Sequence, residues 1–319
     1  MIKRNDLYNL FALSGKNFGN NSIDYSYTFK NFHVFGEAAT TNNFDKAFIN
    51  GLLISMDANV DMSFLYRNIS RSYQSLYTNA FTENASPNNE KGFYSGISIH
   101  PNNAWHIDAY SDFYSFPWLK YRVDAPSTGT DYFIQFTYNP NKLLSIYSSY
   151  HNETKAINYN TGNLALSPVA LKPLQNWKIE INYKIDPLIT FRNRIEMVWF
   201  DKGQTDEADG FLSFVDLLYK PIRKKYSGNM RLQYFETDNY NSRVYAYEDD
   251  VLYSYSIPVF YGKGFRYYFN FKYDVSKKMS LWFRWAQTIY KDQTTIGTGL
   301  DEISGNKKTE VSLQGIYQF

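Results

Sequence analysis

The sequence predicts an all-β protein, an antiparallel up-and-down transmembrane β-barrel, and three observations carry this prediction. Segments of about ten residues alternate between apolar and polar side chains, as strands do when one face is apolar and the other is wet. The connections between these segments are alternately short and long. Aromatic residues are abundant, with 30 Tyr and 25 Phe among 319 residues, yet they are spread over thin strand faces and not gathered into core runs.

The alternation places about fourteen to sixteen strands along the chain. In the first strand, Ile23 and Tyr25 lie opposite Asp24 and Ser26, because successive side chains of a strand point to opposite faces. The same reasoning applies to each later segment. The predicted strands cover residues 22–30, 32–39, 47–56, 60–67, 93–99, 105–113, 132–138, 143–150, 177–184, 191–199, 211–219, 230–236, 265–273, 281–288 and 308–319.

The last predicted strand has one apolar and one polar face, and it ends on an aromatic residue. Val311, Leu313 and Tyr317 share their face with Phe319, the last residue. An aromatic final residue is typical of the terminal strand of bacterial outer-membrane barrels, where it belongs to the insertion signal. Phe319 is therefore the candidate insertion signal, and an edge strand of a soluble sheet is the alternative for this stretch alone.

The connections follow the pattern of membrane barrels, which have short turns at one end and long loops at the other. Segment 237–263 fits this pattern only as two short strands or as a loop folded over or into the lumen. Short turns are predicted at 30–31, 57–59, 101–103, 139–141, 185–187 and 274–277, and long loops at 68–91, 116–127 and 151–173.

The aromatic face of the strands indicates contact with lipid. The inner face of a soluble sandwich would be dominated by Val, Ile and Leu packed on a second sheet, whereas Tyr, Phe and Trp suit a bilayer and its interfaces. We therefore expect residues 1–319 to form a single barrel domain in a bacterial outer membrane. The expected partners are membrane lipid, the barrel-insertion machinery and other envelope proteins. A soluble all-β protein is the alternative.

Composition argues against several other classes of protein. The net charge of +2 is too small to indicate a nucleic-acid partner, and a chain without Cys has no disulfide or thiolate chemistry. The first ten residues contain a basic pair but no apolar stretch and no cleavage site, so they are not a secretory signal. We expect that a signal has been removed or that the chain is the later part of a longer protein.

Five stretches resemble a known family. These stretches, residues 35–39, 83–92, 116–126, 237–248 and 297–303, look like the large barrel of outer-membrane proteins from the Bacteroidota that are catalogued by an amino-terminal helix-hairpin-helix domain. The resemblance implies a barrel whose first strands are encoded upstream. No stretch resembles the helix-hairpin-helix domain itself, so the DNA-binding association of that domain does not extend to this segment.

Charged residues of both signs are predicted to face the lumen, where they pair across strands or line an aqueous path and set ion preference. We expect an Arg at the outward positions Ile181 or Phe269 to be costly, and an Arg at the inward positions Asn182 or Asn270 to be tolerated. The predicted lumen-lining residues are Arg67, Asp108, Asp112, Glu180, Arg192, Arg194, Glu196, Arg231, Arg266 and Arg284.

The sequence lacks the common catalytic motifs, such as a Gly-rich phosphate loop or His-Glu-x-x-His, so we predict no catalytic residue, no cofactor and no enzyme. His33 and His100 are isolated in the sequence. His106 and Asp108 share a strand face, and His151 is placed beside a predicted loop. Hydrogen-bonded histidines are the simpler interpretation of these residues, and a Ser–His or Asp–His site at the barrel rim is the alternative.

Three consecutive acids on a predicted loop are candidates for calcium. Glu248, Asp249 and Asp250 offer the hard oxygen ligands that Ca²⁺ prefers. Asp301 and Glu302 form a second such group. Solvated loop acids are the alternative interpretation for both.

The predicted function is passage across the outer membrane. In this interpretation a polar lumen, partly closed by the loops 68–91, 151–173 and 237–263, passes or binds a solute or polymer. The alternative is a plugged barrel that docks partners in an envelope complex, and DNA uptake follows only from the family association. A continuous lumen would favour transport, and loops packed into it would favour docking.

Overall fold

A computed structural model of the chain describes residues 6–13, 17–77, 79–159 and 167–319. The chain divides into two compact units. Unit 1 comprises Met1–Gln135 and His151–Pro173, and unit 2 comprises Phe136–Tyr150 and Leu174–Phe319. The single domain expected for residues 1–319 stays a prediction. No helix among the described residues is long and apolar enough to cross a membrane.

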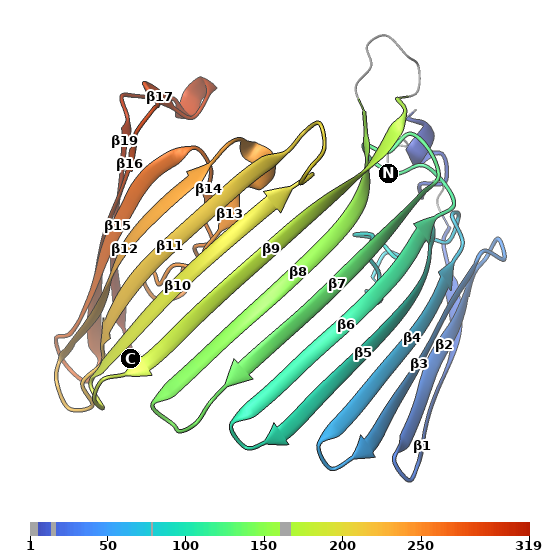
Figure 1. Cartoon of the computed structure of the whole chain (residues 1–319), viewed down its shortest axis with the longest axis horizontal. Coiled ribbons are helices and arrows are strands. Elements are labelled where there is room, and N and C mark those ends of the chain that lie inside the picture. The colour runs from blue at the N-terminus through green and yellow to red at the C-terminus, as the bar shows by residue number, and fades with distance from the viewer. Residues whose placement is uncertain (1–5, 14–16, 78, 160–166) are drawn as a thin grey trace. The chain divides into compact units, whose positions relative to one another are not determined.

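The described residues are almost entirely antiparallel β-strand, and the predicted all-β, up-and-down class is confirmed (Figure 1). A 15-stranded sheet follows the order of the sequence without a crossover, which agrees with the predicted number of strands. The strands of this sheet are β1 (Asn20–Phe29), β2 (Phe32–Thr41), β3 (Lys46–Asp57), β4 (Val60–Ile69), β5 (Glu90–Asn102), β6 (Trp105–Phe116), β7 (Ser127–Tyr138), β8 (Leu144–Asn158), β9 (Val169–Lys184), β10 (Ile189–Phe200), β11 (Ala208–Tyr219), β12 (Tyr226–Thr237), β15 (Lys263–Asp274), β16 (Met279–Tyr290) and β19 (Lys307–Tyr317).

The longer connections contain short strands and 3-10 turns. Two-residue strands pair as β13 (Val244–Tyr245) with β14 (Val259–Phe260), and as β17 (Thr295–Ile296) with β18 (Ile303–Ser304). The helical turns in the described part of the chain are 3-10 turns, namely η1 (Leu7–Asn9), η2 (Tyr240–Ser242) and η3 (Gly299–Asp301).

The connections alternate as predicted. Those at one end of the strands are all short, and the long ones are confined to the other end, which also has the short connections 42–45 and 201–207. The uniformly short set is 30–31, 58–59, 103–104, 139–143, 185–188, 220–225 and 275–278, and the long set is 70–89, 117–126, 159–168, 238–262 and 291–306.

The predicted loop 151–173 is largely wrong. β8 continues to Asn158 and β9 begins at Val169, so His151 lies within a strand. The sequence concealed this because Asn152, Glu153, Thr154 and Lys155 are polar on both faces, and the alternation is lost. Residues 160–166, inside the predicted loop, lie outside the described residues.

In each unit the two faces of the sheet differ, and we call them the charged face and the apolar face. On β15, Arg266 and Tyr268 are buried on the charged face, while Phe265 and Phe269 are 58% and 43% exposed on the apolar face. On β4, Arg67 is fully buried and Tyr66 is exposed. The predicted registers of aromatic and charged residues are therefore present in the folded strands.

Candidate functional site

Loop 238–262 of unit 2 lies along the charged face. It leaves the sheet after Thr237, yet Asp249 accepts hydrogen bonds from Asn229 Nδ2 to its carboxylate (3.0 Å) and from Asn270 Nδ2 to its carbonyl (2.6 Å). Asn229 precedes Thr237 by eight residues in β12, which corresponds to about 26 Å along the strand. Gln314 Nε2 of β19 donates to the carbonyl of Leu252 (2.7 Å). The loop therefore extends over most of the length of the strands.

An apolar cluster holds the base of this loop. Val244, Ala246 and Phe260 are each at most 2% exposed and pack with four buried residues of β10, β11 and β12, namely Val198, Leu212, Phe214 and Phe235. Figure 1 shows β13 and β14 beside the ends of the strands on which they pack. Each of the two interpretations of segment 237–263 is therefore partly correct, because the segment contains two short strands and also folds over the charged face.

Glu248 links the loop to two arginines of the sheet. Its carboxylate accepts from Arg266 Nε (2.6 Å) and Nη2 (2.8 Å), and also from Arg284 Nη2. Arg266 further pairs with Glu310 of β19 (2.8 Å), and Arg284 pairs with Asp250 (2.9 Å). Glu248 is fully buried, so its own hydrogen bonds to the two arginines are shielded from water, whereas the Glu310 side chain is partly exposed.

The calcium interpretation of Glu248, Asp249 and Asp250 is not supported. Glu248 and Asp250 are engaged by Arg266 and Arg284, and Asp249 accepts from Asn229. At Glu248 and Asp250 a cation would have to displace the guanidinium groups that neutralise them. The Asp249 carboxylate lies 3.8 Å from Arg192. The sequence could not show this, because the arginines are far away along the chain.

Arg231 forms the second link between the sheet and the loop. It makes two hydrogen bonds to Asp216 and donates from Nη1 to the carbonyl of Tyr247 in the loop (2.7 Å). Its guanidinium carbon lies 3.6 Å from the ring centroid of Phe214, a cation–π distance. Arg192 approaches the same Asp216 (3.4 Å), so one carboxylate serves two arginines.

The other predicted lumen-lining residues of unit 2 also form a paired group. Arg194 donates from Nε to Glu180 (3.0 Å) and lies 3.5 Å from Glu196 through Nη1. Tyr147 donates its hydroxyl hydrogen to Glu180 (3.0 Å). Arg192 receives a second partner in Asn182, whose oxygen accepts from Nε (3.1 Å). Pairing across strands, the first of the two predicted roles, is what the described geometry shows.

In unit 1, loop 70–89 is tied to the charged face through Glu90. One Glu90 oxygen accepts from Arg67 Nε, and the two oxygens accept from the backbone N–H groups of Glu83 (3.0 Å) and Asn84 (2.8 Å). Arg67 also donates to Asp112 (3.0 Å). The guanidinium lies directly over Gly92, where a Cβ atom would come within 2.4 Å of Arg67 Cζ, so a larger residue there would displace it.

A second acidic group of unit 1 was missed in the sequence. Carboxylate oxygens of Glu83, Asp131 and Glu153 lie within 4.8 Å of one another, a donor set suited to a hard cation. The ammonium of Lys155 contacts Glu153 and lies 3.6 Å from Glu83, so it compensates part of the charge. Burial raises the pKa of the Glu83 carboxyl above its usual value, and Lys155 offsets this only partly.

The histidines make local hydrogen bonds. His151 Nε2 lies 2.6 Å from Asp131, and His106 Nε2 lies 2.7 Å from Asp108, as the shared strand face predicted. Ser98 Oγ contacts both Asp108 (2.9 Å) and His106 Nε2 (3.3 Å). A catalytic triad needs the acid and the nucleophile on opposite ring nitrogens. Here both contact Nε2, so the group does not form that relay.

The other two histidines and the last residue make contacts with residues near them in the sequence. His33 Nδ1 lies 2.7 Å from Thr28 Oγ1, and the ring of His100 lies 4.0 Å from that of His106. Phe319 lies just beyond β19, fully exposed, with its ring 5.4 Å from that of Tyr317.

Three carboxylates on the charged face were missed. Glu90 and Asp216 are partners of the predicted arginines, and Asp131 is the partner of His151. Asp216 carried a usable signal, because it is the only charge in a strand that is apolar on both faces, 211–219. Such a residue is expected to be buried and paired. Glu90 and Asp131 stand in polar stretches, and nothing in their neighbourhood distinguishes them from solvated acids.

No protein-family model matches this sequence, and no curated protein sequence matches it. Solved structures similar to the chain include the outer-membrane protein OmpT of Vibrio cholerae, with 11% identity over 94% of this chain and 89% of that one and a TM-score of 0.43. An anion-selective porin from Comamonas acidovorans shows 7% identity, with 95% and 100% of the two chains covered and a TM-score of 0.41.

A ferric enterobactin receptor from Pseudomonas aeruginosa shows 10% identity, with 93% of this chain and 60% of the receptor covered and a TM-score of 0.43.

Proposed function

We propose that the chain forms an outer-membrane β-barrel whose charged face lines the lumen, and that loop 238–262 gates the passage of a solute through it. The observation that carries the proposal is the attachment of the loop to the charged face by Glu248, which contacts both Arg266 and Arg284. A loop held over a polar face by a few ion pairs can restrict a path and be released from it.

The apolar face supports the placement in a membrane. Leu313, Phe265 and Leu232 are 80%, 58% and 66% exposed. The strands of Leu232 and Phe265 carry the buried Arg231 and Arg266 on their other face. Exposing such large apolar side chains to water would be unfavourable, whereas lipid accommodates them. Strands of 10 to 16 residues are long enough to cross a bilayer when tilted.

The charges support a selective path. Among the described residues, the arginines that we predicted to face the lumen all have carboxylate partners. Releasing loop 238–262 would remove Glu248 and Asp250 from Arg266 and Arg284 and leave a more basic wall. We therefore propose that the open path favours anionic solutes.

The test is conductance in planar bilayers with four forms of the protein: unmodified, Glu248→Gln, a deletion of 244–258, and Tyr255→Ser as the matched control. Tyr255 lies in the same loop but is 87% exposed, so its loss leaves the attachment intact. We expect a small current in the unmodified and Tyr255→Ser proteins. Glu248→Gln and the deletion should both give larger currents with a preference for anions.

No current in any of the four, for protein that migrates as a folded species in unheated gels, would contradict the gate. That outcome would favour the second candidate, a plugged barrel that docks an envelope partner. Two observations support this candidate. Loop 238–262 packs along the charged face, as expected for a plugged barrel. The loop also displays Tyr253 and Tyr255, each 87% exposed, and aromatic side chains of this kind are common in binding surfaces.

We also propose, from the five stretches quoted above, a relationship to the helix-hairpin-helix outer-membrane proteins of the Bacteroidota. The relationship predicts that the coding sequence upstream of Met1 encodes further strands and a helix-hairpin-helix domain. Sequencing that region tests it, and an upstream region without either element would contradict it.

A further inference from the structure

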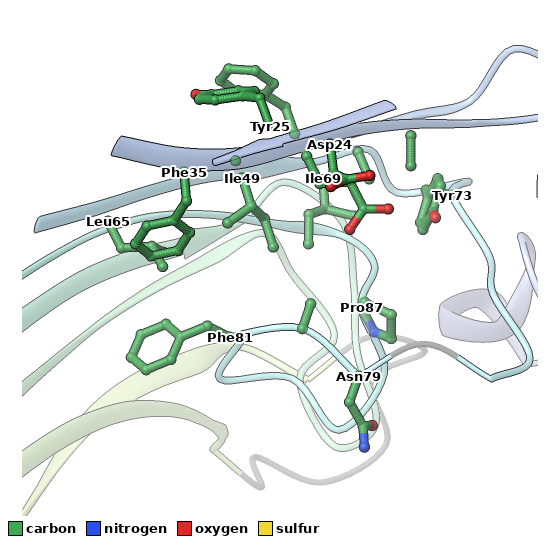
Figure 2. Close-up of a pocket in the computed structure, with 16 residues that line it drawn as sticks. Asp24, Tyr25, Phe35, Ile49, Leu65, Ile69, Tyr73, Asn79, Phe81 and Pro87 are labelled. Carbon is green, nitrogen blue, oxygen red and sulfur yellow. The ribbon is translucent and has the colours of Figure 1, made fainter. Parts of the chain in front are cut away.

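A pocket of about 400 Å³ lies in unit 1 between the charged face of β1–β4 and loop 70–89. Figure 2 shows Phe35, Ile49 and Leu65 pointing into it from the strands, with Phe81 and Pro87 on the opposite side. The wall is therefore largely aromatic and aliphatic.

Two carboxylates occupy one edge of this pocket. Asp24 of β1 and Glu37 of β2 are register partners and line the pocket together, and Figure 2 shows Asp24 on the pocket side of the sheet. Tyr25, the neighbour of Asp24, also lines the pocket, at the edge formed by β1 and β2. Both acids thus line the same pocket, at an edge where both residues are exposed to solvent.

This arrangement differs from the other charges on the face. Within the described ranges, neither Asp24 nor Glu37 has a hydrogen-bond or ion-pair partner, whereas Arg67, on the second strand from Glu37, pairs with Glu90 through Nε and with Asp112 through Nη1. The residue beside Glu37 on β3 is Ile49, which offers no charge. Like charges directly opposite each other on neighbouring strands destabilise a sheet. A cation between them would reverse the sign of that interaction.

We propose that this pocket binds a small organic ammonium ion with a compact apolar body. The ammonium group would lie between Asp24 and Glu37, and the apolar body would lie against Ile49, Leu65 and Phe81. A bare metal ion would use the carboxylates but not the apolar wall, and a neutral apolar molecule would use the wall but not the carboxylates. Only a ligand with both parts matches both halves of the pocket.

The probes are a matched pair of equal shape, protonated adamantan-1-amine and neutral adamantan-1-ol. Binding is measured by isothermal titration calorimetry on the full chain in nanodiscs, with empty nanodiscs subtracted to remove partition into lipid. We expect the amine to bind about tenfold more tightly than the alcohol, because two carboxylates attract it in a partly enclosed site.

Three variants separate the two halves of the pocket. The double variant Asp24→Asn with Glu37→Gln should reduce the affinity for the amine to that for the alcohol. Phe81→Ala should weaken both probes. The control Asp61→Asn changes an acid on the same face that is outside this pocket, and it should leave the preference for the amine unchanged.

The site is overturned if the unmodified protein binds the two probes equally or binds neither, or if the preference for the amine survives in the double variant. The conductance test is independent of this one. If the protein passes no current but prefers the amine, the pocket is supported and the gate is contradicted. If it passes current but does not prefer the amine, the gate is supported and the pocket is contradicted.

Discussion

Asp216 on β11 and Arg231 on β12 are register partners, and the two fully buried side chains are joined by hydrogen bonds of 2.6 Å from Nε and 2.7 Å from Nη2. Replacing Asp216 with Leu leaves a buried guanidinium without its main counter-charge. We expect the free energy of unfolding to fall by about 3–5 kcal/mol, the usual cost of breaking a buried pair from one side. Urea titration of the protein in detergent measures it.

The matched control replaces both partners. Asp216→Leu combined with Arg231→Met removes the charges together, and such replacements are commonly neutral or stabilising. The double variant should therefore be more stable than the Asp216→Leu single variant. If the two single changes simply add in the double, the pair is not coupled and the assignment is wrong.

Adjacent positions on β4 test the two faces. Phe64 lies on the apolar face and stacks on Phe93 at 6.4 Å between centroids, whereas Ser63 lies on the charged face beside Asp61. Phe64→Arg should cost about 2–4 kcal/mol if the strand crosses a bilayer near its midplane. Ser63→Arg should cost much less. Equal costs in a lipid-vesicle folding titration would argue against a lipid-facing surface.

The inward control chosen from the sequence, Asn270, does not serve this purpose. It is 9% exposed and donates to the carbonyl of Asp249 in loop 238–262. An Arg there would displace the loop whatever the surroundings of the strand. Asn182 is also engaged, with Arg192 and Glu180, so Ser63 is the better position.

Glu90 should control the order of loop 70–89. Glu90→Ala removes the acceptor for the N–H groups of Glu83 and Asn84, and it also removes one partner of Arg67. We expect amide hydrogen exchange in residues 79–89 to become at least about tenfold faster, while exchange in loop 238–262 stays unchanged. Unchanged protection of residues 79–89 would show that other contacts hold the loop.

Glu83 should make stability depend on pH. Its pKa is raised in the folded protein, mainly by burial, so the folded state holds the proton more tightly than the unfolded chain does. Its contribution therefore favours folding at low pH and declines as pH rises from the unfolded pKa through the folded value. Glu83→Gln, which stays neutral, should raise the thermal midpoint at pH 7.5 more than at pH 4.5. The opposite order would contradict the burial assignment.

The strands could be predicted because their pattern is local. The boundaries 60–67 and 265–273 were predicted and are extended by only a few residues in β4 and β15. The side of the sheet on which Arg231 and Arg266 lie followed from counting alternate residues. A strand such as β8 could not be delimited, because Glu153 and Lys155 alternate with polar neighbours.

The partners of the arginines could not be predicted, because pairing depends on register and on how the loops fold. Asp216 meets Arg231 only because β11 and β12 pair in one particular register. Glu248 reaches Arg284 from a loop that could equally have pointed into solvent. The sequence therefore identified the arginines of the candidate site, but not most of the carboxylates that they contact.

The order of the large sheet also bears on how the chain folds. Each strand between β1 and β19 pairs with the strands before and after it in that sheet, and the longest connection is the segment between β12 and β15. Loop closure between neighbours is entropically inexpensive for short connections. Pairing can therefore begin at any hairpin and grow by adding the next strand. We expect the slow step on this route to be the pairing of β12 with β15, which closes a loop of 25 residues. The entropic cost of closing a loop rises by about 0.6 kcal/mol for each doubling of its length.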